Sequence, residues 1–139
     1  MAGYSKRPLV EKLGIKPGQK LYFGNPPENY SRALGALPKD AVLLKSLKGP
    51  CGFIQFFTQD KAELESAFPR LKKNLAPDGS LWISWPKGAS KIKTDLNENI
   101  VREIGLRNSL VDIKVCAVDE VWSGLKFVIR LKDRGASSS

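Results

Sequence analysis

The chain has 139 residues, of which 42% are hydrophobic, and this length and composition predict one domain with a single core. It contains no histidine, which excludes Ser-His and Cys-His nucleophile pairs and removes the commonest metal ligand. The formal net charge of +9 favours an anionic partner, nucleic acid among the candidates, without identifying one.

The first third of the chain predicts two short helices and two strands. The first helix begins near Pro8, which suits an early helical position, and stops at Gly14. Residues 20–24 form a strand, and the proline pair at 26–27 starts the second helix. Residues 40–47 are the second strand candidate.

The middle of the chain predicts a strand, a helix and a strand. Residues 51–57 are apolar on both faces, which is typical of a buried strand. From 58 to 76 the apolar residues follow helical spacing, and the proline, aspartate and glycine at 77–79 end that helix. Residues 80–86 form the next strand, with Trp82 in the core.

The last third predicts one more helix and a hairpin. Asp95 and Glu98 have capping-box spacing at the start of the helix. Residues 110–122 and 125–132 alternate closely enough to predict an antiparallel pair, with the turn at 123–124.

This order of elements defines the expected fold class. Alternating strands and helices form a mainly parallel sheet with helices on both faces, closed here by a C-terminal antiparallel hairpin. We therefore predict a single three-layer, Rossmann-like α/β domain over residues 1–133 and a disordered tail at 134–139. Ligands of such sheets bind at the carboxyl ends of the strands.

The sequence argues against a disulfide framework, a metal site and a membrane location. Cys51 and Cys116 are too few for a disulfide framework and fit no metal spacing, so no metal site is predicted. No apolar run approaches the roughly 20 residues of a membrane span, and the start is charged where a signal peptide is apolar. We expect a cytoplasmic protein with no membrane partner.

Three segments together resemble the C-terminal half of a class I S-adenosylmethionine-dependent methyltransferase. They are the strand at 51–57, the helix-turn-strand sequence LKKNLAPDGSLWISW at 71–85, and the closing hairpin. More closely, the chain from about Gly3 to Arg130 resembles a family of short bacterial proteins of unknown function. The resemblance implies a truncated, degenerate methyltransferase-like fold that lacks one helix-strand unit between its second and third strands.

The sequence departs from the methyltransferase pattern where the cofactor would bind. The cofactor loop of that fold carries two or three glycines because its backbone passes close to the ligand, whereas only Gly24 is present here. The prolines at 26–27 remove two N–H donors. Residues 45–48, Lys-Ser-Leu-Lys, stand where the fold has an acid for the ribose hydroxyls. We expect no cofactor, S-adenosylmethionine included.

Asn25 and the two following prolines are similar to the Asn-Pro-Pro-aromatic tetrad with which many amino-group methyltransferases hold a target nitrogen. That tetrad follows the fourth strand of the fold, but here the sequence follows the first strand and has Glu28 in the aromatic position. We interpret it as the start of a helix. The alternative is an adapted ligand loop, because a helix N-terminus beside lysines can hold an anion.

Two segments are the best candidates for chemistry. In SWPKGAS, Lys87 beside Trp85 could engage a phosphate or stack a base, although Trp85 could equally be a lid on the core. At the hairpin, Asp119 and Glu120 could act as acid and base, but adjacent strand residues point to opposite faces. The structural alternative is that one of these acids pairs with a lysine to fix the hairpin.

The leading hypothesis is a non-catalytic binding or regulatory protein on a methyltransferase-like scaffold. Its predicted ligand-binding residues are Gly24, Asn25, Trp85, Lys87, Thr94, Asp95 and Trp122. One alternative is a small-molecule transferase or hydrolase that works through Lys87, Asp95 and Asp119. The other is a nucleic-acid-binding module, which the net charge favours.

Overall fold

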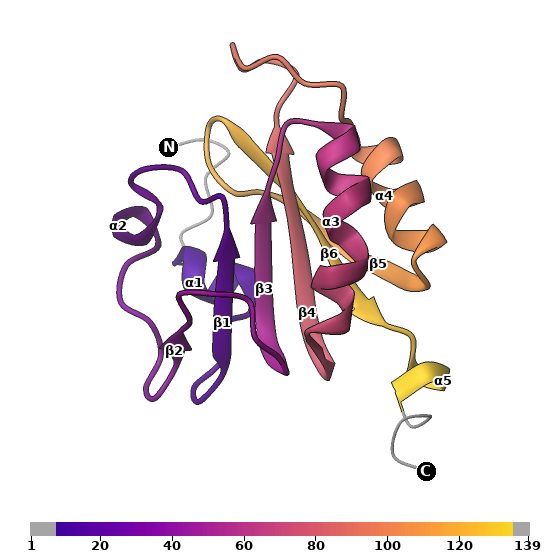
Figure 1. Ribbon diagram of the computed structural model, residues 1–139. Coiled ribbons are helices and arrows are strands. Elements are labelled where there is room, and N and C mark those ends of the chain that lie inside the picture. The colour runs from indigo at the N-terminus through magenta and orange to yellow at the C-terminus, as the bar shows by residue number, and fades with distance from the viewer. Residues whose placement is uncertain (1–7, 135–139) are drawn as a thin grey trace.

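Six strands form one sheet in the computed structural model, which describes residues 8–134 (Figure 1). The strands are β1 (Lys20–Gly24), β2 (Val42–Leu43), β3 (Cys51–Phe57), β4 (Leu75–Pro86), β5 (Leu110–Ala117) and β6 (Trp122–Ile129). Their order across the sheet is β2-β1-β3-β4-β6-β5. The first four strands are parallel, and β6 runs antiparallel to both β4 and β5. The predicted α/β class and the C-terminal hairpin are therefore confirmed.

Helices lie on both faces of this sheet. They are α1 (Leu9–Leu13), α2 (Tyr30–Leu34), α3 (Lys61–Lys73), α4 (Glu98–Arg107) and α5 (Leu131–Arg134). Helices α3 and α4 cover one face and α1 lies behind the other (Figure 1). Each face has its own buried apolar cluster. Trp82 is fully buried on the α1 side, as predicted, and its indole N–H donates to the Leu13 carbonyl at 2.9 Å.

The turn between α3 and β4 differs from the prediction. The sequence placed residues 77–79 in a turn, whereas they lie inside β4, which begins at Leu75. The helix ends at Lys73, and Asn74 is its C-cap. The Asn74 side-chain amide donates to the Arg70 carbonyl at 2.9 Å, and the Asn74 backbone carbonyl accepts from the Cys51 N–H at 2.8 Å. The chain therefore reverses at Asn74, before the proline is reached.

The hairpin turn is also shifted from its predicted position. The sequence placed it at 123–124, but these residues lie in β6. A carboxylate oxygen of Asp119 accepts the N–H groups of Val121 and Trp122, both at 2.8 Å. Asp119 therefore forms the turn in the manner typical of aspartate.

Two further boundaries of the first third are wrong. Helix α2 begins at Tyr30, not at the prolines, and the Pro27 carbonyl accepts the Tyr30 N–H at 3.0 Å in the preceding turn. The strand expected over 40–47 is limited to the two residues of β2. Neither helix nor strand lies between β2 and β3, as the resemblance implied.

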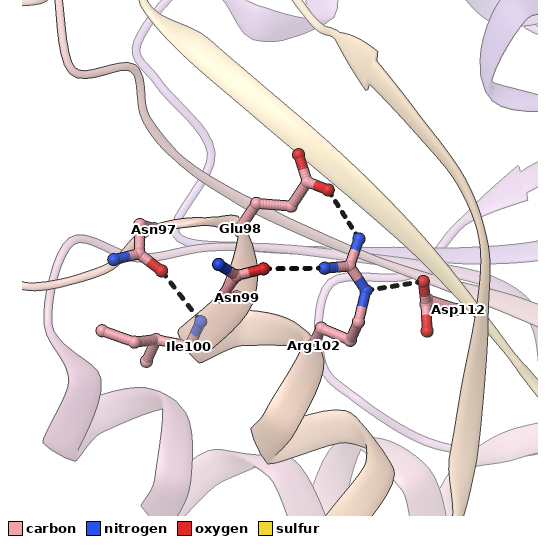
Figure 2. Close-up of polar contacts among 6 residues, drawn as sticks. All are labelled: Asn97, Glu98, Asn99, Ile100, Arg102 and Asp112. Atoms are coloured by element: carbon pink, nitrogen blue, oxygen red, sulfur yellow. Dashed lines mark hydrogen bonds and ion pairs between the residues drawn. The ribbon is translucent and has the colours of Figure 1, made fainter.

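The capping box predicted for α4 is wrong, and Figure 2 shows the observed arrangement. Asn97 caps the helix, since its side chain accepts the Ile100 N–H at 2.9 Å. Glu98 instead accepts from Arg102 at 2.5 Å, and Arg102 also donates to Asp112 on β5 at 2.9 Å. These hydrogen bonds raise the pKa of Arg102, and the bond with Asp112 has the largest effect. The bond with Asp112 also attaches α4 to the edge strand β5.

The end of the chain is described only to residue 134. Arg134, which the sequence placed in a disordered tail, ends α5 and donates to the Ile129 carbonyl at 2.8 Å. The rest of that tail, 135–139, lies outside the described residues. Among the helices that are described, none combines the length and the apolar character needed to cross a membrane.

The contact between α4 and β6 yields a stability prediction. A Cβ atom at Gly105 would lie 2.1 Å from the ring of the fully buried Phe127. We expect Gly105→Ala to lower the free energy of unfolding by about 1–3 kcal/mol, measured by urea denaturation, because overpacking outweighs the better helix propensity of alanine. Gly88→Ala is the control, since nothing lies within 4 Å of that position. A more stable Gly105→Ala variant would contradict this packing.

Candidate functional site

Strands β1, β3 and β4 end at one edge of the sheet, where the chain enters the loops 25–29, 58–60 and 87–97 (Figure 1). We call this the carboxyl edge. Parallel sheets bind their ligands at this edge, because the helices that follow the strands leave a crevice there. The predicted site residues lie at or just after the ends of these strands, or at the hairpin turn beside them.

The loop after β1 is fixed to β3. A Cβ atom at Gly24 would lie 2.5 Å from the ring of Phe56, so only glycine fits. Asn25 adopts a φ of 51°, and its side-chain amide donates to the Phe57 carbonyl at 3.2 Å. Glycine is therefore required at position 24 because the backbone passes close to Phe56 of the protein itself.

Three adjoining hollows, each about 430–450 Å³, lie along the carboxyl edge. The central hollow is lined by Asn25, Phe57, Thr58, Gln59, Asp60, Glu63 and Trp122. A second hollow shares Gln59 and Asp60 with it and adds Lys93, Thr94 and Asp95. The third shares Asn25 and Glu63 and extends along α3 to Arg70. Because they share these residues, the hollows lie next to one another, and we refer to the three together as the depression.

Carboxylates gather in this depression around the N-terminus of α3. Asp60 accepts the Ala62 N–H at 2.9 Å, and Asp95 accepts the Lys61 N–H at 2.8 Å. Glu63 accepts from the hydroxyl of buried Thr58 at 2.5 Å. The positive end of the helix dipole favours negative charge at this place. The depression is therefore rich in acceptors.

A buried polar chain runs beneath the carboxyl edge. The Tyr30 hydroxyl donates to the side-chain carbonyl of Gln55, and the Gln55 amide donates to the Ser84 hydroxyl at 3.1 Å. All three residues are buried, and burial raises the pKa of Tyr30 well above its usual range. Tyr30 is therefore neutral at physiological pH and acts as a hydrogen-bond donor.

The structure brings together four of the seven predicted ligand-binding residues. Asn25 and Trp122 line the central hollow, and Thr94 and Asp95 line the second. Gly24 packs under Phe56 as described, and the remaining two lie elsewhere.

Trp85 and Lys87 do not take the roles that the sequence suggested for them. Trp85 is 5% exposed and belongs to the core on the α3 side, so a base cannot stack on it without rearrangement. Lys87 donates its backbone N–H to the Val121 carbonyl at 2.7 Å and lines neither hollow that holds its proposed partners.

The three candidate catalytic residues are likewise separated. Asp95 lines the second hollow, whereas Asp119 lines a different hollow between α2 and the hairpin turn. Both carboxylates accept backbone N–H groups, which is a structural use of an acid. Within residues 8–134, no group of three Cys, Asp or Glu side chains is placed to hold a metal ion.

Gln55, Thr58, Asp60 and Glu63 are not among the predicted ligand-binding residues, although Thr58 and Asp60 lie in a strand-end loop, 57–61, where a ligand is expected. Gln55 is the one polar residue inside an otherwise apolar strand, and that exception was the available signal. Asp60 and Glu63 lie at the start of α3, where the helix dipole alone accounts for acids, and sequence spacing does not show that this helix begins at a ligand-binding edge.

Comparison with solved structures defines the class of fold. A SAM-dependent methyltransferase from Aquifex aeolicus matches with a TM-score of 0.62 and 16% identity over 88% of each chain. Magnesium protoporphyrin IX methyltransferase from Synechocystis PCC 6803 with bound SAH matches with a TM-score of 0.58 and 12% identity, over 88% of this chain and 78% of that one.

A third neighbour is the tRNA methyltransferase TrmK of B. subtilis, with a TM-score of 0.54 and 13% identity over 99% of this chain and 70% of that one. At these identities the likeness shows the fold alone, so the chain has a methyltransferase-like fold. No protein-family model matches the sequence, and a search of curated proteins found no match.

The role of Asp95 can be tested through stability. We expect Asp95→Ala to lower the free energy of unfolding by about 1 kcal/mol, because the Lys61 N–H at the start of α3 loses its acceptor. Asp95→Asn, which keeps a side-chain oxygen, should recover most of the loss in the same denaturation experiment. Equal losses for both variants would show that the charge, and not the cap, is what matters.

Proposed function

We propose that this protein is a small binding or regulatory protein on a methyltransferase-like scaffold, and that it does not transfer methyl groups. The observation that carries the proposal is the closure of the loop after β1. Gly24 packs under Phe56, and Asn25 is hydrogen-bonded to the end of β3. The backbone that would approach a cofactor is thereby held in contact with β3.

The residues present do not fit S-adenosylmethionine, the cofactor that the fold implies. Structural neighbours are described with bound SAM or SAH. Here Pro26 and Pro27 contribute no N–H donor to the loop, and they hold φ near −65°. Exposed Lys45 and Lys48 follow β2, where the resemblance implies an acid for the ribose hydroxyls. No reaction step through the cofactor follows from this arrangement.

The depression at the carboxyl edge supports binding of a different small molecule. Each of its hollows, at about 430–450 Å³, is large enough for a small ligand. Phe57 and Trp122 stand edge to face, with ring centroids 5.3 Å apart, and provide an apolar wall. Asp60 and Glu63 provide acceptors beside it. We infer a ligand with an apolar part and an amino or other donor group.

The rival activity, a transferase or hydrolase that works through Lys87, Asp95 and Asp119, has less support. Catalysis of that kind needs the groups within hydrogen-bond reach of one substrate. Asp95 and Asp119 line different hollows, and Lys87 lines neither. A binding protein requires only a hollow of this size that a ligand can enter.

A thermal-shift screen tests the proposal with S-adenosylmethionine, S-adenosylhomocysteine, and a panel of nucleotides and amines. We expect the methyl-cycle compounds to leave Tm unchanged and a donor-bearing compound to raise it, since ligand at 100 times its Kd adds about 2.7 kcal/mol. Glu63→Gln should reduce that shift, because a neutral amide binds an ammonium group less strongly than a carboxylate does.

The matched control is Glu65→Gln, which neutralises an exposed acid on the same helix outside the hollows. Equal effects of the two variants would place the ligand away from the depression. A shift with S-adenosylmethionine, accompanied by methyl transfer to any acceptor, would overturn the proposal.

A further inference from the structure

Four lysines gather on the α1 side of the sheet, and we call Lys12, Lys16, Lys114 and Lys126 the lysine cluster. Lys114 on β5 and Lys126 on β6 are direct cross-strand partners. The Lys114 ammonium donates to the Lys12 carbonyl at 3.1 Å, and the Lys12 ammonium donates to the Ala117 carbonyl at 2.9 Å. The cluster therefore joins α1 to the C-terminal hairpin.

The Lys126 ammonium reaches the end of α1. It lies 3.4 Å from the place where a side chain at Gly14 would begin. Lys16 follows two residues later and is close enough, together with Lys114, to repel the charge of Lys126. Lys126 is half-buried, so water compensates this repulsion only in part.

Within residues 8–134, no salt bridge includes a lysine of the cluster. The ion pairs in this range all use an arginine as the cation. Asp112, the acid on β5, faces α4 and pairs with Arg102 instead. Like charges directly opposite each other on a β-ladder are destabilising. In the part of the chain that the structure describes, the four ammonium groups are thus held together without a carboxylate in salt-bridge contact.

This arrangement fits an extended anion better than a compact one. Lys16 and Lys114 are exposed and Lys12 and Lys126 are half-buried, and the four come from α1, the segment that follows it, β5 and β6. Lysine ammonium groups are point charges that neutralise successive phosphates without reading bases. The net charge of +9 would steer such a ligand toward the protein.

We propose that the lysine cluster binds the phosphodiester backbone of a nucleic acid, independently of base sequence. The surface is distinct from the depression at the carboxyl edge, and the proposal does not depend on the small-molecule ligand proposed there. The proposal assigns a binding partner to the net positive charge of the protein, which the depression at the carboxyl edge does not explain.

The test is fluorescence anisotropy with a labelled oligonucleotide, single-stranded and duplex, over roughly 50 to 200 mM salt. The variant is Lys114→Ala with Lys126→Met, which keeps an apolar stem at the half-buried position. We expect weaker binding and a slope of log affinity against log salt that falls by about 0.9 for each lysine removed from a duplex contact. Lys73→Ala with Lys91→Ala, two exposed lysines outside the cluster, is the charge-matched control.

A second measurement separates a binding role from a structural one. Burial and the neighbouring lysines lower the pKa of Lys126, which means that charging it is costlier in the folded protein than in the unfolded chain. Lys126→Met alone should therefore raise Tm in the absence of nucleic acid while weakening oligonucleotide binding. A structural lysine would give a lower Tm.

Three results of the oligonucleotide and stability measurements would overturn the proposal. They are a salt-independent affinity, equal losses for the cluster variant and its charge-matched control, and a lower Tm for Lys126→Met. Binding to phosphatidylserine vesicles without binding to either oligonucleotide would also overturn it, because the partner would then be an anionic membrane surface.

Discussion

The burial of β3 on both faces is the constraint on which the rest of the structure depends. This strand pairs with β1 on one side and β4 on the other, and all of its residues except Gly52 are buried. A strand without a solvent-facing side requires cover on both faces, which α3 supplies on one side and α1 with α2 on the other. The parallel pairing then brings Asn25 and Thr58 to the same edge.

The fold class could be predicted because it depends on periodicity and element order, which the sequence carries directly. The failures involve contacts between distant segments. Asp95 caps a helix that starts 34 residues earlier, so local spacing assigned it to α4 instead. Trp85 was undecided between a lid and a ligand platform, and only the packing of the α3 side decides that. For the candidate site, the carboxyl edge and four of its residues could be predicted from the sequence, but the neighbouring acids Asp60 and Glu63 could not.

The two surfaces differ in the polar side chains that they present. Side-chain acceptors gather at the carboxyl edge around the start of α3, whereas the lysine cluster occupies the α1 side of the hairpin. Trp122 and Lys126 lie on the same strand, β6, so the apolar wall of one surface and a charge of the other share a rigid element.

The buried hydrogen-bonded chain of Tyr30, Gln55 and Ser84 fixes the register of β3. If β3 slipped by one residue, Gln55 would turn toward the apolar cluster under α3, and its amide would lose both partners. An apolar residue at this position would tolerate the slip, because both faces of the strand would then be apolar. One glutamine thus distinguishes two arrangements that hydrophobic burial alone leaves nearly equivalent.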